Sequence, residues 1–304
     1  MKKNVIIKNF DSVKKETGVN KAGINLNANL TTPKYIIKES EAKLHISVGN
    51  SKIGKGIYGF STLPGNKDHM LILNHSILLT DIPGTCSKYC TNCAKDGACY
   101  AWRDAKLHNN VTIRAWGENT LLLRNGALFG LVEDYISKKN KKYIKSGGKE
   151  LPKITTFRIN VSGEVETLEE LEGWNSIAKK HPEINFGLYT KNYEALEAFM
   201  IKHGDTEPNF VVNVSQWHGC ADEFLKKYPG KFNVFEYDDS CKKDKGGLSE
   251  EQIARLTALP HCPAVNKKGK HNKDAKGDPI TCDGCKKCYE KRRSAIQTIA
   301  VYAH

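Results

Sequence analysis

The sequence predicts an α/β protein with a mainly parallel sheet, and three observations lead to this prediction. Apolar runs of strand type alternate with stretches in which apolar residues recur every three or four positions, as in amphipathic helices. The chain has 304 residues, which is enough to bury a substantial core. Helical stretches separate most of the six expected strands, and strands joined in this way form parallel sheets with right-handed crossovers. Six such units are too few for an eight-stranded barrel and fit a partial (β/α)6 TIM-like barrel, with a doubly wound open sheet as the alternative.

The expected elements follow one another from residue 70 onward. The expected strands are residues 70–79, 154–161, 184–189, 210–215, 232–237 and 295–303. The expected helices are residues 104–125, 127–139, 168–180, 193–203, 221–228 and 249–259. Thr167 is expected to cap the third of these helices, because Glu169 and Glu170 follow it in the first turn.

Composition divides the chain into three segments. Residues 1–45 are rich in Lys and Asn with weak periodicity, and we expect an N-terminal extension there. Residues 46–259 contain the predicted partial barrel and the first group of cysteines. The start of this segment, residues 46–70, is rich in glycine and is expected to be rich in turns. Residues 260–304 are expected to form a Cys-rich auxiliary metal segment that ends in the last strand.

The N-terminus and the apolar runs point to a cytoplasmic protein. No apolar run reaches the roughly 18 residues that a membrane span needs. The apolar stretch near the N-terminus is only Val-Ile-Ile, whereas a signal peptide has a core of about 7–15 apolar residues. We therefore expect no membrane partner.

The chain has a net charge of +13, and the charge is concentrated near the C-terminus. Residues 262–293 hold ten Lys or Arg against four Asp or Glu. Such an excess fits a solvated, lysine-rich surface, and it equally fits a polyanionic partner. Among polyanions, a nucleic acid or a nucleotide substrate is the best match.

The ten cysteines give the strongest functional signal. Thiols stay reduced in the cytoplasm, so disulfides are not expected. Eight of the ten form two groups of four, namely Cys86, Cys90, Cys93 and Cys99, and Cys262, Cys282, Cys285 and Cys288. Thiolates that bind one ion or cluster must lie close together, and short loops arrange this, so each group is expected to bind metal. The remaining two, Cys220 and Cys241, are expected to be buried free thiols.

The identity of the metal has two interpretations. The C-terminal group has the spacing C-x2-C-x2-C with a distant fourth cysteine, which is typical of a [4Fe–4S] cluster. Two zinc sites with four thiolates each are the alternative, since zinc ribbons use similar pairs. His271 lies between Cys262 and Cys282 and is expected to be a solvated side chain rather than a ligand.

The N-terminal group resembles a known signature. Cys86, Cys90 and Cys93 have the spacing C-x3-C-x2-C, which resembles that of radical S-adenosylmethionine enzymes, although Asn92 stands where that family often has an aromatic residue. The resemblance implies a [4Fe–4S] cluster with one open iron, which binds the amino and carboxylate groups of S-adenosylmethionine. It also implies that an electron from the cluster cleaves the sulfonium and produces a 5′-deoxyadenosyl radical.

A second resemblance follows the next expected strand. Ser162, Gly163 and Glu164 resemble the Gly-Gly-Glu segment of the same family, which receives the methionine amino group. The resemblance implies that Glu164 accepts a charge-assisted hydrogen bond from this ammonium. At the ends of the following strands, Thr190, Lys191 and Ser215 are expected either to contact the carboxylate, ribose or adenine of the cofactor or to cap loops.

Several further motifs occur along the chain, namely Thr-Cys at 85–86, Cys-Tyr-Ala at 99–101, the 161–164 turn, Tyr-Thr-Lys at 189–191 and the Cys-rich end. Together they resemble the phage "gene product 88" family over about residues 48–304. The resemblance implies that Cys99 is a regular member of the first group, so the cluster uses three of Cys86, Cys90, Cys93 and Cys99. The sequence leaves open which three, and an open iron requires that one of the four stays unbound.

These observations predict one function and one alternative. The prediction is a radical S-adenosylmethionine enzyme with a partial (β/α)6 barrel of radical-SAM type and a C-terminal Cys-rich segment. It would hold two [4Fe–4S] clusters, take electrons from a donor such as flavodoxin or ferredoxin, and act on nucleic acid or a nucleotide. The alternative is a non-catalytic, zinc-stapled nucleic-acid-binding protein. No residue is predicted to be a catalytic acid or base.

Overall fold

The computed structural model describes most of the chain and divides it into two compact units. The described residues are 39–49, 53–65, 82–90, 99, 101, 109–148, 153–217, 219–241, 247–268, 270–290 and 298–302. One unit comprises residues 1–46, 60–135 and 160–166, and the other comprises residues 47–59, 136–159 and 167–304. The strand expected at residues 70–79 lies outside the described residues.

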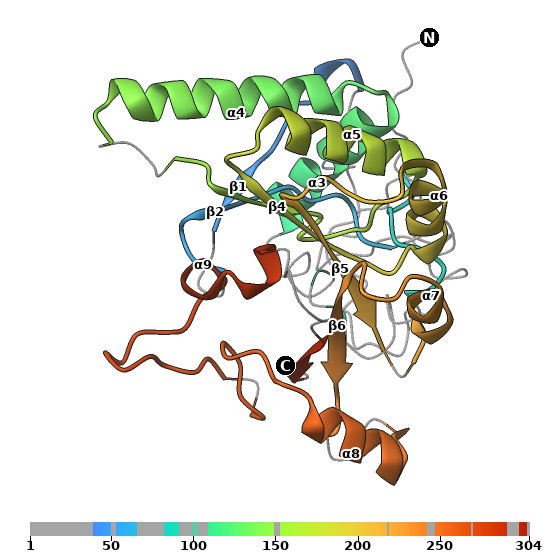
Figure 1. Ribbon diagram of the computed structural model, residues 1–304. Coiled ribbons are helices and arrows are strands. Elements are labelled where there is room, and N and C mark those ends of the chain that lie inside the picture. Colours follow the sequence, from blue (N-terminus) through green and yellow to red (C-terminus); the bar gives the residue numbers. More distant parts are fainter. Residues whose placement is uncertain are drawn as a thin grey trace, which may run out of the picture. The chain divides into compact units, whose positions relative to one another are not determined.

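The second unit contains one open, mainly parallel sheet (Figure 1). Its strands are β1 (Ser47–Val48), β2 (Ile57–Gly59), β3 (Thr156–Ile159), β4 (Asn185–Thr190), β5 (Phe210–Gln216), β6 (Asn233–Asp238) and β7 (Thr298–Tyr302). They lie side by side in chain order. The β1–β2 pair is antiparallel, and every later pair is parallel. The predicted α/β class and parallel sheet are confirmed. A doubly wound sheet reverses its strand order at a switch point, and the described sheet has no such reversal.

The glycine-rich residues 46–70 contain turns, as predicted, and also two strands that the sequence analysis missed. This segment contains β1 and β2, and β2 is the first parallel strand of the sheet. Ile57 and Tyr58 are both fully buried, so β2 shows none of the alternation of polar and apolar residues that marks a half-buried strand. With only three residues between glycine-rich turns, β2 has no distinctive sequence signal.

The predicted helices are confirmed to within a few residues for most elements. They are α3 (Asn109–Arg124), α4 (Leu128–Lys145), α5 (Leu168–Lys180), α6 (Tyr193–His203), α7 (Asp222–Lys227) and α8 (Glu250–Ala258). The largest difference is in α4, which continues to Lys145 instead of ending at residue 139. Thr167 caps α5 as predicted, because its hydroxyl accepts the Glu170 N–H at 3.2 Å. Within the described part of the chain, no helix has the length and apolar character needed to cross a lipid bilayer.

The sheet presents two different faces because side chains alternate along each strand. Phe157 and Phe186 lie on the face covered by α5, where the Phe157 ring is 5.8 Å from that of Trp174. The α6 helix packs beside α5 (Figure 1). On the opposite face, Gly187 lies directly beneath the ring of Tyr289, which belongs to the cysteine-rich segment. Helices therefore cover one face of the sheet, and the cysteine-rich segment covers part of the other.

In the first unit, α3 holds the end of the predicted N-terminal extension. The buried carboxylate of Glu118 accepts hydrogen bonds from Lys43 N–H at 3.0 Å, from the His45 ring at 2.8 Å and from Arg114 Nε at 2.7 Å. Burial alone would raise the pKa of Glu118, but the hydrogen bonds from Arg114, His45 and Lys43 together lower it below its usual value.

This arrangement predicts a loss of stability in acid. Because the pKa of Glu118 is lower in the folded chain than in the unfolded chain, its ionised form stabilises the fold above an unfolded pKa of about 4.5. That contribution disappears as the pH falls through the folded value. We expect Glu118→Gln to lower the free energy of unfolding at pH 6 and to have a smaller effect at pH 3, as measured by urea unfolding. A difference that stayed constant with pH would contradict this prediction.

Candidate metal centres

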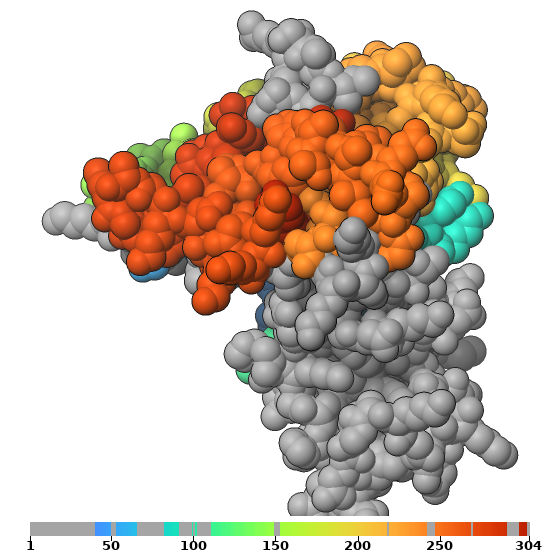
Figure 2. All heavy atoms as spheres, turned by 90° about the horizontal axis from the view of Figure 1, so that it is seen from below, coloured from blue at the N-terminus to red at the C-terminus, as the bar shows by residue number. Residues whose placement is uncertain are grey.

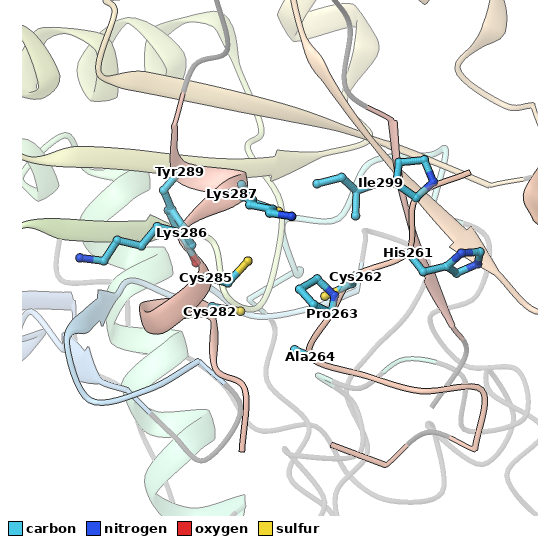
Figure 3. A pocket seen from close by; sticks show the side chains of 12 residues that line it. His261, Cys262, Pro263, Ala264, Cys282, Cys285, Lys286, Lys287, Tyr289 and Ile299 are labelled. Carbon is cyan, nitrogen blue, oxygen red and sulfur yellow. The ribbon is translucent and has the colours of Figure 1, made fainter. Parts of the chain in front are cut away.

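The four cysteines of the C-terminal group line one cavity in the second unit. Cys262, Cys282, Cys285 and Cys288 surround a space of about 170 Å³. In Figure 3 the labelled side chains of Cys262, Cys282 and Cys285 point toward this common space. Cys262 is fixed to the sheet edge because its N–H donates to the carbonyl of Ala300 in β7 at 2.8 Å. The structure therefore brings together the C-terminal cysteines that the sequence grouped.

The turn between β1 and β2 supports the cysteine-rich segment. The short helix α9 (Cys282–Cys285) begins after Thr281, and Asp283 in its first turn contacts the β1–β2 turn. The carboxylate of Asp283 accepts the Gly56 N–H at 3.1 Å, and its own N–H donates to the Ile53 carbonyl at 2.8 Å. A Cβ atom at Gly56 would lie 2.4 Å from an Asp283 oxygen, so only glycine allows this approach.

The sheet supports the other end of the segment, where the 3-10 helix η4 (Lys287–Tyr289) lies. Asn213 in β5 donates from its side-chain amide to the Cys288 carbonyl at 3.0 Å. Tyr289 is only 1% exposed and packs on Gly187, whose Cβ would lie 2.5 Å from the tyrosine ring. Cys288 is thus held between two contacts with neighbouring strands.

The cavity is a shielded environment for thiols. The pKa of the Cys288 thiol is raised to about 11: burial is the largest cause, a hydrogen bond with Tyr189 acts in the opposite direction, and the neighbouring thiols of Cys262, Cys282 and Cys285 add to the increase. The guanidinium of Arg158 lies 4.7 Å from the centre of the Tyr189 ring. A positive charge is therefore present on the sheet face beneath the cysteines.

The donor set consists of four thiols, which suits either a zinc ion or a [4Fe–4S] cluster. Among the described residues, no three or more His, Cys, Asp or Glu side chains are arranged to hold one metal ion. The metal of this cavity therefore stays a prediction.

The neighbouring histidines do not add to this donor set. The ring of His261 points away from the labelled cysteines in Figure 3, and its Nε2 lies 2.8 Å from the carboxylate of Asp238. His271 is exposed and does not line the cavity, in agreement with the prediction of a solvated side chain. The thiols are therefore the metal-binding groups that this cavity offers.

The first cysteine group lies in the other unit and is described in part. Cys86, Cys90 and Cys99 are half-buried, and Cys93 lies outside the described residues. Cys86 is positioned by Gly65, whose carbonyl accepts the Cys86 N–H at 2.7 Å and whose N–H approaches the Cys86 sulfur at 3.2 Å. That three of these four cysteines bind one cluster stays a prediction.

The Ser162–Glu164 turn lies against the residue that precedes Cys86. The N–H of Glu164 donates to the Thr85 hydroxyl at 2.7 Å, and the Thr85 and Thr62 hydroxyls are 2.8 Å apart. The Thr62 N–H donates to the Ser162 carbonyl at 3.0 Å. Two segments that the sequence connected only by resemblance are therefore joined by direct hydrogen bonds.

Polar side chains of this turn are buried. Ser162 is 2% exposed, and its hydroxyl has no hydrogen-bond partner among the groups that the structure describes. Glu164 is 5% exposed, and one of its carboxylate oxygens accepts the Val165 N–H at 3.2 Å. A buried hydroxyl without a partner costs free energy, and a polar ligand would satisfy it.

Sequence reasoning missed the arginine that stabilises this arrangement. Arg124, at the end of α3, forms a bidentate ion pair with Glu166, with distances of 2.6 and 2.9 Å. The same guanidinium donates to the Pro83 carbonyl at 2.8 Å. Arg124 therefore links the segment before Cys86, at Pro83, to Glu166 at the end of the turn formed by residues 162–166. No local pattern marks this pairing, because the three partners are about 40 residues apart in the sequence.

The other predicted cofactor contacts belong to the second unit. The Thr190 hydroxyl accepts the Asn192 N–H at 2.9 Å, which is a loop-capping contact. Ser215 lies near the end of β5, where its carbonyl accepts the Tyr193 hydroxyl at 2.7 Å, and Lys191 directly follows β4. The expected burial of Cys220 was wrong, because this thiol is exposed. Cys241 is partly buried.

Comparison with known proteins identifies a family. Residues 37–291 match the model of a family described as Gene product 88. No curated protein and no solved structure matches the chain. The matched range contains the eight grouped cysteines and the Ser162–Glu164 turn.

Proposed function

Since this chain belongs to the phage Gene product 88 family, whose description names no chemistry, we propose its function from the two sites: an iron–sulfur enzyme of radical S-adenosylmethionine type. The contact between Thr85 and Glu164 carries the proposal. It joins the loop that starts at Cys86 to the turn that resembles the methionine-binding segment of such enzymes. The sheet, with its parallel strands in chain order, is consistent with a partial (β/α)6 barrel.

The first site would bind a [4Fe–4S] cluster through three of Cys86, Cys90, Cys93 and Cys99. With S-adenosylmethionine bound, the cluster supplies one-electron cleavage of the sulfonium. The carboxylate of Glu164 would accept a hydrogen bond from the methionine ammonium, and the buried Ser162 hydroxyl would gain a partner. Gly163 keeps the backbone close to the threonine hydroxyls and so sets the position of Glu164.

The cavity lined by Cys262, Cys282, Cys285 and Cys288 would hold a second [4Fe–4S] cluster. All four positions are cysteines, so this cluster would have no open iron and would act as an auxiliary centre. Electrons would come from a reduced carrier such as flavodoxin or ferredoxin in the cytoplasm. The substrate would be a nucleic acid or a nucleotide, because of the positive charge near the second site.

A second candidate function is a zinc-stapled nucleic-acid-binding protein without catalysis. The lysines of the C-terminal cysteine-rich segment favour it, since they would bind nucleic acid whichever metal is present. Zinc in both cysteine groups would then only stabilise the fold.

Metal content separates the two candidates. For anaerobically purified protein we expect about eight irons and eight sulfides per chain. For Cys285→Ser we expect about four irons, because only the C-terminal cluster is lost. We also expect S-adenosylmethionine to perturb the visible spectrum of both proteins. About two zincs per chain and a colourless protein would contradict the proposal and favour the second candidate.

The Glu164→Gln variant tests the placement of the cofactor. A lost charge-assisted hydrogen bond of about 1.5–3 kcal/mol corresponds to roughly 10- to 100-fold weaker binding of S-adenosylmethionine. Binding is measured by titration of the iron-loaded protein. Glu250→Gln, an exposed change in the first turn of α8, serves as the control and is expected to bind normally. If Glu164→Gln retained full affinity with its iron, the placement would be wrong.

A further inference from the structure

The chain between Cys262 and Cys282 forms two consecutive tight turns that carry lysines. We call residues 265–280 the lysine hairpins; the structure describes all of them except residue 269. Val265 pairs with His271, and Lys273 pairs with Pro279, both in antiparallel bridges. The segment leads directly into α9, and Figure 2 shows it (orange to orange-red) exposed on one face of the molecule.

Side chains inside the turns fix the shape of the lysine hairpins. The Asn266 side-chain oxygen accepts the N–H groups of Lys268 and Lys270 at 2.9 and 3.1 Å. In the second turn, one Asp274 carboxylate oxygen accepts the N–H groups of Lys276 and Asp278 at 2.9 and 3.0 Å. These are turn-stabilising contacts of the Asx type, so the lysines project from ordered backbone.

The lysines themselves are free to bind a ligand. Lys268, Lys270, Lys273 and Lys276 are exposed, and none of them forms an ion pair with a residue that the structure describes. The hairpins also contain Asp274 and Asp278, and one carboxylate oxygen of Asp274 accepts hydrogen bonds from the backbone of its own turn. Beyond the hairpins, Lys286 and Lys287 line the cavity of the C-terminal cysteines (Figure 3). Lysines therefore lie both on the hairpins and at the edge of the cavity, where the Lys286 ammonium is 4.0 Å from the Asp283 carboxylate.

The composition of the hairpins indicates what kind of polyanion fits them. Residues 266–278 contain no Phe, Tyr or Trp, no Met, no Arg and no large aliphatic residue. A segment that binds a membrane surface needs apolar side chains that insert between the lipids. Protein interfaces concentrate their affinity in buried aromatic and Arg anchors. Lysines on ordered turns without such anchors match a partner that is recognised by phosphate charge alone.

We propose that the lysine hairpins are the docking surface for the phosphate backbone of a nucleic acid. The bound nucleic-acid strand would then lie beside the cavity of Cys262, Cys282, Cys285 and Cys288. The inference rests on the proposed function only in treating this nucleic acid as the substrate. The docking itself requires no cofactor chemistry. Its affinity depends on charge, so it decreases steeply with salt.

The test compares two charge-matched variants of the full-length protein. One changes Lys268, Lys270 and Lys276 to Gln, and the other changes Lys141, Lys145 and Lys179, exposed lysines on α4 and α5, to Gln. Binding of a fluorescent single-stranded 20-mer DNA and of its duplex is measured by anisotropy between 50 and 300 mM KCl. The hairpin variant should bind at least tenfold more weakly at low salt. For the duplex, the slope of log K against log salt should become less negative by about 2–3 in the hairpin variant. The helix variant should bind like the unchanged protein.

Other outcomes would overturn the proposal. Equal weakening in both variants would show that net charge, and not this surface, attracts the DNA. Binding to vesicles of one-third phosphatidylserine, without binding to either DNA, would indicate a lipid surface. Iron content is measured on the same samples. A failure of the proposed function can therefore be distinguished from a failure of the docking surface. Iron-free protein that still binds DNA through the hairpins would contradict the proposed function only, whereas iron-loaded protein without this binding would contradict the docking surface only.

Discussion

Gly163→Ala is expected to disrupt the first site and to destabilise the fold. Gly163 has φ +79°, a backbone conformation that L side chains rarely adopt. A Cβ atom there would lie 2.0 Å from the Thr62 hydroxyl and 2.5 Å from the Thr85 hydroxyl, both of which are buried. The threonines would have to move apart, and the Glu164–Thr85 hydrogen bond would break. We expect the free energy of unfolding to decrease by about 2–4 kcal/mol and S-adenosylmethionine binding to be lost.

Two other glycines separate the causes of this effect. Gly204 also has positive φ, +75°, but no atom would meet its Cβ within 4 Å, so Gly204→Ala isolates the backbone cost of about 1–2 kcal/mol. Gly130 lies inside α4 in open space, and Gly130→Ala should be neutral or stabilising by about 0.5–1 kcal/mol. Urea unfolding measures the free energy of unfolding of the three alanine variants. If Gly163→Ala cost no more than Gly204→Ala, the close contact with the threonines would not exist.

Gly187→Ala is expected to displace the cysteine-rich segment from the sheet. Its Cβ would lie 2.5 and 2.7 Å from two carbons of the Tyr289 ring, which is fully buried and cannot shift without moving its neighbour Cys288. Overpacking of this kind costs about 1–3 kcal/mol in a well-packed core. We expect lower stability and about four fewer irons per chain, lost from the C-terminal site alone.

A second substitution shows whether the ring causes this effect. Combining Gly187→Ala with Tyr289→Leu removes the ring atoms that the new methyl group would contact. The effects of the two changes should therefore be strongly non-additive, with the double variant retaining more iron than Gly187→Ala alone. Gly130→Ala is again the control. Full iron content in Gly187→Ala would contradict the packing of Tyr289 against β4.

Much of the fold follows from local sequence patterns. The α5 and α6 helices begin and end at the predicted residues, because their apolar periodicity and their N-terminal capping residues agree. The parallel strands β3 to β7 each overlap a predicted apolar run, and β4, β5 and β6 extend one residue beyond it. The β2 strand was missed since three buried residues between glycines carry no periodic signal. Its place in the sheet depends on pairing with β3, about 100 residues later.

The candidate sites also contain features that the sequence predicts and features that it does not. Cysteine spacing predicts the C-terminal group because three of its four cysteines are close in the chain, and the structure places all four around one cavity. Gly56 and Gly187 support that group through close approaches between distant segments, which a single sequence does not reveal. Arg124 likewise acts through partners far away in the chain. Residues that bind a ligand tend to form motifs, whereas the residues that position them are set by tertiary packing.

The position of the cysteine-rich segment in the chain also determines the order in which the sheet can be completed. Cys262, Cys282, Cys285 and Cys288 all lie between β6 and β7, so this segment is the connection to the last strand. During synthesis β6 is the outer edge of the sheet until residue 298 has left the ribosome and β7 can pair with it. An unpaired parallel edge is a site of association between chains. A newly made chain therefore protects this edge only after the segment with all four cysteines has been made.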